Sequence, residues 1–359
     1  MKDSELDAGQ DRVVGCLLGG ALGDALGYPV EFIRSWQAIV AAHGRGAPER
    51  LAYAHPAPAL ISDDTQMTLF VAEGCIRAVQ RMSNRGICSP PSVILHALVR
   101  WYATQIGDRS ILDSMSGGGL LLDEPRLYAQ RAPGNTNLNA LALCARNERV
   151  PPNDSKGCGA VMRSAPIGLG ARSIEVAWEI ALESGASTHG HPSGHLSAAY
   201  FAAVVQRVAR NDALTTAMEQ ADTLLAQAQD HQEMTQAIAA AREVARAGIP
   251  APDALESLGE GWVGEEALAI ALACALTVEG DGPEATSAAL WRSVLHRGDS
   301  DSTGSLTGNL LGAMHGTRCL PPRWLHELEL RDLIERVGND LFRSAWLGED
   351  LDTDDYPPY

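Results

Sequence analysis

The chain has 359 residues, a formal net charge of -17 at pH 7 and 45% hydrophobic residues. This length suits one large domain or two ordinary ones, and the apolar fraction is ample for a sizeable core. The acidic charge argues against a protein that holds nucleic acid through phosphate contacts, because those contacts need a dense basic surface. We therefore do not expect nucleic acid as a partner.

The first residues, 1–12, are polar and acidic and lack the basic and apolar regions of a secretory signal. The most apolar runs, 13–27 and 267–278, are shorter than the ~20 residues that cross a bilayer, and Asp24 interrupts the first. The seven cysteines are scattered, odd in number and without a C-x-x-C pair, which is typical of reduced thiols. The sequence therefore predicts a cytoplasmic protein without membrane contact.

Two ladders of glycines are the next feature, one at positions 15, 19, 23 and 27 and the other at positions 304, 308, 312 and 316. Residues four apart lie above one another on a helix, so each ladder gives its helix a face without side chains. Such a face lets another backbone approach closely. If the two ladders face each other, segments far apart in the sequence meet in space.

The remaining elements are also predicted as helices, because alanine and leucine dominate and apolar residues recur at helical spacing. Alternating β-branched runs are almost absent. The sequence therefore predicts an all-α fold, an orthogonal multi-helix bundle. In chain order the helical windows are 66–76, 91–104, 138–146, 174–184, 195–209, 213–230, 233–247, 265–278, 283–295 and 329–343.

Segments rich in Gly, Pro, Ser and Asn mark the loops between these helices, and among them is 297–304. No linker or change in composition divides the chain. We therefore expect one domain over 11–347, with an N-terminal extension at 1–10 and an acidic C-terminal tail at 348–359. A solenoid is not indicated, because no repeat of the usual ~30–45 residues is present.

Two short acidic clusters, 62–65 (Ser-Asp-Asp-Thr) and 299–302 (Asp-Ser-Asp-Ser), carry most of the expected chemistry. Each stands at the start of a predicted helix, so a helix cap with a first-turn acid explains either one alone. Carboxylates and hydroxyls are also good ligands for Mg²⁺ or Mn²⁺. The second cluster looks like a calcium loop, but Leu310 occupies the position of the bidentate glutamate of an EF-hand. If the glycine ladders pair, the clusters converge on one hard cation or a pair of them.

Three further motifs deserve an interpretation. The segment Asn153–Arg163 is a glycine- and serine-rich loop, which is either a plain turn or a set of N–H groups that face a pyrophosphate. His189, His191 and His195 do not have the spacing of a zinc site. Trp262 stands among glycines and is predicted either to pack in the core or to stack on a nucleobase. No Walker loop or G-x-S-x-G motif is present, and no strand precedes the first glycine ladder as a Rossmann fold requires.

The combination of five blocks in one order closely resembles the ADP-ribosylglycohydrolase family, whose founding type is the hydrolase that reactivates ADP-ribosylated dinitrogenase reductase. The resemblance covers roughly residues 11–316. The blocks are Gly15-x-x-x-Gly19-Gly20-Ala21-x-Gly23-Asp24-Ala25-x-Gly27 with Glu31, then Ser62-Asp63-Asp64-Thr65, Ser155-Lys156-Gly157-Cys158-Gly159-Ala160-x-Met162-Arg163, Thr188-His189 and Gly298-Asp299-Ser300-Asp301-Ser302.

The resemblance implies an all-α fold with two divalent cations, Mg²⁺ or Mn²⁺, in a central cleft. It implies catalytic roles for Glu31, Asp64 and Asp301. The implied metal ligands are Ser62, Asp63, Asp64, Asp299, Asp301 and Ser302. The family often has threonine at the two serine positions, and serine supplies the same oxygen. The residues expected to contact the substrate, with Trp262 included as a base platform, are Glu31, Gly134, Asn135, Ser155, Gly157, Cys158, Gly159, Met162, His189 and Trp262.

The function that the resemblance implies is hydrolysis of the N-glycosidic bond between ADP-ribose and a modified side chain of a protein. Arginine is favoured because residues 27–32 look like the bacterial arginine-directed branch. An oxocarbenium-like centre would form as the bond stretches, and a water activated by the metals would attack from the opposite face. Serine-linked ADP-ribose, O-acetyl-ADP-ribose and modified nucleic acid stay open as substrates. A different class is an immunity protein that binds and blocks an ADP-ribosyltransferase toxin, with residues 1–10 reaching into the partner. The retained carboxylates argue against a catalytically silent member.

Overall fold

The computed structural model describes residues 3–112, 118–148, 150 and 152–357. Sixteen α-helices run through this part of the chain, and its only β structure is two isolated bridges. The predicted all-α fold is confirmed. The helices are α1 Asp3–Gly27, α2 Trp36–His43, α3 Asp63–Arg85, α4 Pro90–Ile106, α5 Asn135–Ala145, α6 Ala165–Gly170, α7 Ile174–Ala186, α8 Pro192–Val208, α9 Leu214–Leu225, α10 Gln232–Arg246, α11 Pro252–Glu256, α12 Gly264–Leu276, α13 Pro283–Val294, α14 Ser300–His315, α15 Pro322–Glu327 and α16 Arg331–Phe342.

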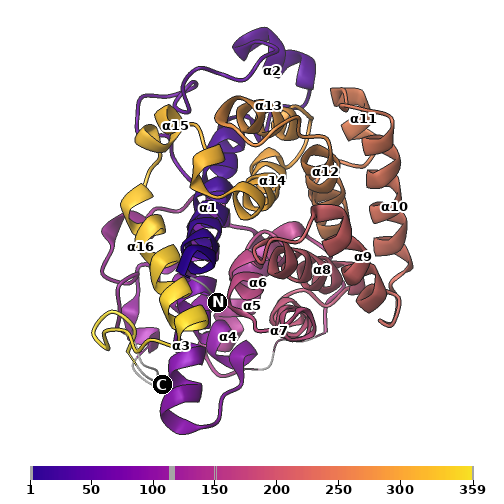
Figure 1. Ribbon diagram of the computed structural model, residues 1–359. Helices are drawn as coiled ribbons and strands as arrows, with labels where there is room; N and C mark the ends of the chain where they lie inside the picture. The colour runs from indigo at the N-terminus through magenta and orange to yellow at the C-terminus, as the bar shows by residue number, and fades with distance from the viewer. Residues whose placement is uncertain (1–2, 113–117, 149, 151, 358–359) are drawn as a thin grey trace.

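Helices α1 and α14 lie side by side near the middle of the molecule (Figure 1). Their glycine ladders face each other, which is the condition that the spacing alone left open. A Cβ atom on Gly19 would collide with the carbonyl oxygen of Gly308, and one on Gly27 with that of Ser300. The two backbones therefore touch where side chains usually hold helix axes ~8–10 Å apart. This contact brings the end of α1 against the start of α14.

The first turns of α1 are formed by residues that the sequence assigned to an extension. Gln10 Nε2 donates a hydrogen bond to Asn339 Oδ1 of α16 at 2.6 Å, and Gly9 packs against the ring of Trp346. Met1, also expected in the extension, lies outside the described residues. In the described part, the extension is thus continuous with the core helix.

The length argument against a membrane span was wrong, because α1 begins well before residue 13. The segment Ser4–Val30 has 27 residues and is apolar enough to cross a membrane by length and composition. The protein itself buries 89% of its apolar window, as for the core helix of a soluble protein. This long apolar helix is therefore explained by its partners α14 and α16.

The other helices pack around this pair. Helices α12 and α13 contact α14, α16 contacts α1 and α3, and α8 joins α6, α7, α9 and α12. Each of the ten predicted windows coincides with a helix, with shifted ends, while α2, α6, α11 and α15 were missed because they span only five to eight residues. The loop predicted at 297–304 was wrong in its second half, since α14 begins at Ser300.

The acidic tail is docked on the domain. Tyr356 is buried, and its hydroxyl donates to Asp340 Oδ2 of α16 at 2.9 Å. The backbone N–H of Leu120 donates to the carbonyl of Asp355 at 2.9 Å. These bonds attach residues 355 and 356 to two separate parts of the fold, while 358–359 lie outside the described part.

Candidate active site

The two acidic clusters stand at helix N-termini. Ser62 caps α3, where its Oγ accepts a hydrogen bond from Asp64 N at 3.2 Å. Asp299 caps α14 and accepts one from Ser302 N at 3.3 Å. Serine and aspartate suit the cap position, and the helix dipole favours negative charge there. The capping interpretation therefore holds, and capping fixes the positions of the carboxylates beside it.

A cavity of about 220 Å³ lies between these helix starts. Two segments that are far apart in the sequence thus supply carboxylates to one cavity, which is the convergence that the glycine ladders predicted. The lining residues are Glu31, Asp63, Asp64, Ala132, Gly134, Asn135, Thr136, Asn137, Gly157, Cys158, Gly159, Met162, His189, Trp262, Asp299, Asp301 and Ser302.

Two of the residues expected in the site, Ser62 and Ser155, do not line the cavity. Ser62 is fully buried, and its hydroxyl forms a hydrogen bond with Asp301 as well as capping α3. Ser155 Oγ lies 3.0 Å from Thr136 Oγ1, in the wall of the cavity. Both serines therefore support residues that face the cavity.

The carboxylates crowd together. Oxygen atoms of Glu31, Asp299 and Asp301 all lie within 4.8 Å of one another. Glu31 Oε2 and Asp64 Oδ2 are buried and have no hydrogen-bond partner within the described part of the chain. Burial raises the pKa of Glu31 to about 10, and repulsion from Asp301 and Asp299 adds to the increase. Burial likewise raises the pKa of Asp64 well above its usual range, again with a contribution from Asp301.

Positive charge from the protein does not neutralise this cluster. Within the described residues, no Lys or Arg side chain forms an ion pair with the five carboxylates that line the cavity. Burying a charged carboxylate without a partner raises the free energy of the folded state. A bound cation makes the charged form favourable instead. Hard oxygen donors and orphaned carboxylate oxygens fit Mg²⁺ or Mn²⁺. The donor set is therefore suited to divalent cations.

Asp24 was missed as a site residue, because in the sequence it only interrupts an apolar run. It is fully buried, and its carboxylate accepts hydrogen bonds from Ser62 N at 2.9 Å and from the N–H and hydroxyl groups of Thr65. Burial and the charge of Asp301 raise the pKa of Asp24 to about 7. Asp24 thus ties the end of α1 to the start of α3. The feature of the sequence that could have identified Asp24 is its place between Gly23 and Gly27 of the first glycine ladder.

Cys158 contributes a thiol to the acidic cavity. Its Sγ lies 2.9 Å from Asp299 Oδ2 and 3.6 Å from Ser302 Oγ. Burial raises the pKa of this thiol well above its usual range, and Asp299 adds to the increase. The thiol is therefore a neutral donor to Asp299.

The glycine-rich loop forms a short antiparallel bridge with the segment that holds Trp262. Cys158 N donates to the carbonyl of Trp262 at 3.1 Å, and Gly264 N donates to that of Lys156 at 2.8 Å. The side chain of Lys156 pairs with Glu233 and Glu265 at 2.5 and 2.6 Å. The loop is thereby anchored to α10 and α12.

His189 lies against the glycines of this loop. Its Nδ1 is 2.8 Å from Thr188 Oγ1, which accepts a hydrogen bond from Arg163 Nη2 at 2.8 Å. A Cβ atom on Gly159 would come within 3.2 Å of the ring of His189. Burial, with the charge of Arg163, lowers the pKa of His189 to about 3, so the ring is neutral. His195 Nδ1 bonds to the carbonyl of His189 at 3.1 Å.

Trp262 lines the cavity beside Glu31. Its ring stacks on that of Phe32, with centroids 6.1 Å apart and planes 25° apart, and Arg34 lies 6.0 Å from its centroid. The tryptophan is half-buried at the wall of the cavity. Trp262 is thus not packed in the core, which was one of the two roles that the sequence left open for it.

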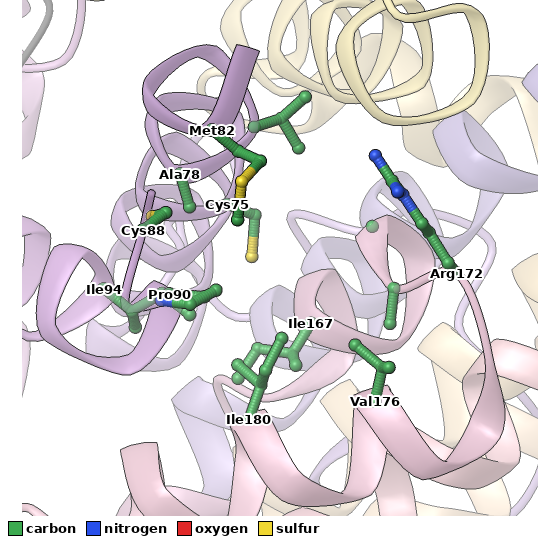
Figure 2. Close-up of a pocket in the computed structure, with 13 residues that line it drawn as sticks. Cys75, Ala78, Met82, Cys88, Pro90, Ile94, Ile167, Arg172, Val176 and Ile180 are labelled. Carbon is green, nitrogen blue, oxygen red and sulfur yellow. The ribbon is translucent and has the colours of Figure 1, made fainter. Parts of the chain in front are cut away.

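A larger cavity lies elsewhere, between α3 and α4 on one side and α6 and α7 on the other (Figure 2). Its volume is about 330 Å³, and Arg172 is the one charged residue among the described residues that line it. Apolar side chains such as Ile167 and Ile180 form most of its wall. It offers no carboxylates to a cation, so the chemistry of the site belongs to the smaller acidic cavity.

The all-α fold joins two capped acidic helix starts in one cavity, as the resemblance to the ADP-ribosylglycohydrolases implied. The family model described as ADP-ribosylglycohydrolase matches residues 5–350, and the chain belongs to this family. Membership supports glycohydrolase activity in the broad sense.

Individual relatives are more distant. The chain is 25% identical over 356 residues to a protein of Pseudomonas putida (strain GB-1) named ADP-ribosylarginine hydrolase Tri1, covering 95% of this chain and 81% of that one. It is also 25% identical to the protein of the same name from Serratia proteamaculans (strain 568), covering 93% and 80%. A solved structure described as an ADP-ribosylglycohydrolase-related protein complex has a TM-score of 0.64 and 23% identity, covering 94% of this chain and 99% of that one. This last likeness shows the fold.

Proposed function

We propose that the protein is a dinuclear-metal hydrolase that removes ADP-ribose from modified protein side chains, with ADP-ribosyl-arginine as the substrate. The observation that carries this proposal is the meeting of carboxylates from α3 and α14 in one cavity, where Asp64 Oδ2 and Glu31 Oε2 lack a hydrogen-bond partner among the described residues. The family supports the glycohydrolase class, and the names of two relatives support arginine as the modified residue.

The residues that we assign to two divalent cations, Mg²⁺ or Mn²⁺, are all oxygen donors. When bound, such cations supply positive charge that polarises ribose hydroxyls and lowers the pKa of a nearby water. Ser62 and Ser302 are assigned as the hydroxyl donors, although Ser62 lies behind the wall of the cavity. The four carboxylate donors are Asp63, Asp64, Asp299 and Asp301.

The chain's own groups have separate tasks in this proposal. Asp64 and Asp301 orient the attacking water and accept its proton, because both carboxylates line the cavity. Glu31 faces them from the end of η1 (Tyr28–Val30) and holds a proton for the departing guanidine nitrogen. As the C1″–N bond stretches, an oxocarbenium-like sugar forms, and the water held by Asp64 and Asp301 attacks it from the opposite face.

The diphosphate is assigned to backbone N–H groups of the glycine-rich loop. Cys158 N already donates to Trp262. We therefore assign the phosphate contacts to the N–H groups of Gly157 and Gly159, which have no side chain to block approach. Met162 and the neutral ring of His189 form the apolar and polar walls for the nucleoside. This part of the site contributes proximity.

Blockade of an ADP-ribosyltransferase toxin by direct binding is the alternative. The idea of a free N-terminal arm is weakened, because residues 3–10 belong to α1, where Gly9 packs against Trp346 and Gln10 bonds to α16. An Asp64→Ala, Asp301→Ala double variant separates the two functions. If that variant still inhibits the toxin in vitro, the protein acts by binding, whereas loss of protection supports hydrolysis.

The decisive experiment measures ADP-ribose release from three substrates: an arginine-modified peptide, a serine-modified peptide and O-acetyl-ADP-ribose. We expect release from the arginine peptide with Mg²⁺ and none with EDTA. Release from the serine peptide or from O-acetyl-ADP-ribose alone would correct the linkage. No release from any of the three would remove the hydrolase proposal.

A further inference from the structure

A third cavity adjoins the acidic one through Glu31 and Phe32. Its volume is about 360 Å³, and Phe32 forms part of its wall while stacking on Trp262 of the acidic cavity. The residue before Phe32 is Glu31, which lines the acidic cavity. One short segment thus separates the two spaces.

The walls of this third cavity are built from segments that flank the site residues. Ala25 follows Asp24, Tyr28 opens η1, and Leu60 lies two residues before Ser62. Burial raises the pKa of Tyr28, and Glu31, Asp24 and Asp301 add to the increase, which places this ring in electrostatic reach of the site. The third cavity is therefore a neighbour of the acidic one.

The described side chains that line this cavity include no carboxylate, in contrast to those of the acidic cavity. Leucine, alanine, proline and phenylalanine side chains form most of it, with His55 and Tyr28 as the polar members. Ribose and phosphate groups need polar partners, so the sugar nucleotide is not the natural occupant. An apolar side chain is the chemistry that this lining accepts.

The cavity is held in shape from outside. The hydroxyl of Tyr53 donates to the carbonyl of Leu26 at 2.9 Å, and Ala52 N donates to Glu327 Oε2 at 3.1 Å. A bridge between Ala59 and Leu328 fixes the other end of this loop. Beside it, Phe32 is 60% exposed, although it is a large apolar side chain next to the site. A preformed pocket with an exposed aromatic rim is typical of a binding surface.

We propose that the cavity lined by Tyr28, Phe32, Leu51, Ala54 and Leu60 binds an apolar side chain next to the modified residue of the substrate protein. The inference rests on the proposed function, because it places the modified residue at Glu31. Phe32 and Trp262 then form the boundary between sugar and polypeptide. The site thereby selects targets by their sequence as well as by their ADP-ribose.

The test uses two synthetic peptides with one ADP-ribosylated arginine each, flanked by leucines in one and by glycines in the other, together with free ADP-ribose. Dissociation constants are measured in EDTA, where no cleavage is expected, and KM is measured in Mg²⁺ buffer. The proteins compared are the wild type, Ala54→Trp, which fills the cavity, and Ala228→Trp. Ala228 is the matched control, a half-buried alanine in the wall of a different cavity between α7, α8 and α9.

We expect the wild type and Ala228→Trp to bind the leucine peptide about tenfold more tightly than the glycine peptide. Ala54→Trp should bind the two equally and keep its affinity for ADP-ribose. Equal affinities in the wild type, or a preference that survives in Ala54→Trp, would overturn the inference. If Ala54→Trp does not fold, Phe32→Ala replaces it, because truncating an exposed side chain spares the core and should weaken the same preference. Binding with the leucine preference but without cleavage would sink the hydrolase proposal and leave the subsite standing.

Discussion

Two groups of buried carboxylates in this protein differ in how their charge is compensated. Glu73 of α3 is fully buried, and its oxygens lie 2.6 Å from Arg77 Nη2 and 3.0 Å from Arg100 Nη2. Both arginines are buried as well, so the group carries its own positive charge. It joins α3 to α4.

The acidic cavity stands at the N-terminal end of the same helix, α3, whereas Glu73 lies in the middle of that helix. Asp63 and Asp64 are also buried, and burial raises the pKa of both, with the charges of Asp301 and Asp24 adding to the increase. A protein that only needed buried carboxylates for packing would pair them as Glu73 is paired. The difference indicates that the second group leaves its compensation to a bound ligand, and the four predictions below test that distinction.

The largest effect is expected for Asp301→Asn. Loss of one central carboxylate should lower ADP-ribosyl-arginine hydrolysis by more than the ~10–100-fold that an outer-shell partner of a metal site costs. Without Mg²⁺ the variant should unfold at the same temperature as the wild type or a higher one, because a repulsive charge is gone. The rate of ADP-ribose release in Mg²⁺ and thermal unfolding in EDTA measure the two effects. A clear loss of stability in EDTA would mean that Asp301 is structural.

Glu73→Gln should behave in the opposite way. It leaves two buried guanidinium groups without their carboxylate, so the free energy of unfolding should fall by ~3–5 kcal/mol. Hydrolysis per folded molecule should not change, because Glu73 does not line the cavity. Urea unfolding followed by circular dichroism gives the stability. If activity falls while stability is kept, the distinction between the two groups fails.

The contact that assembles the acidic cavity gives a smaller effect. In Gly308→Ala, the new Cβ would meet the carbonyl of Gly19, which belongs to a helix backbone and cannot move aside. We expect ~1–3 kcal/mol of destabilisation, together with weaker Mg²⁺ binding as α14 is pushed away from α1. Gly46→Ala is the control, since nothing lies near a Cβ atom there. Unchanged metal affinity in a destabilised Gly308→Ala would separate the glycine contact from the site.

The sequence predicted those parts of the fold and site that local spacing encodes. Glycines every four residues indicated the pairing of α1 with α14, and the capped acidic starts at 62–65 and 299–302 indicated the cavity between them. Asp24 was not predicted, because its role depends on the fold placing its carboxylate below Ser62 N.

The contacts of individual side chains could not be predicted from the sequence either. Nothing local indicates that Cys158 donates to Asp299, or that Phe32 stacks on Trp262. Each of these contacts joins segments whose approach is set by the packing of other helices. Short helices such as α6 and α15 were missed for a related reason, because six residues show too little periodicity to predict one.

The smallest effect is expected at Cys158, and it tests whether the thiol belongs to the charged group. A neutral thiol donates to Asp299. Cys158→Ser keeps a donor, so kcat/KM should change by less than about threefold. Cys158→Ala removes the donor, so kcat/KM should fall about tenfold, as for other outer-shell partners of a metal site. Because burial keeps the thiol protonated, iodoacetamide at pH 8 should modify Cys158 more slowly than an exposed thiol. Fast alkylation, or equal losses in the two variants, would show that the thiol is ionised and adds one more negative charge to the cluster.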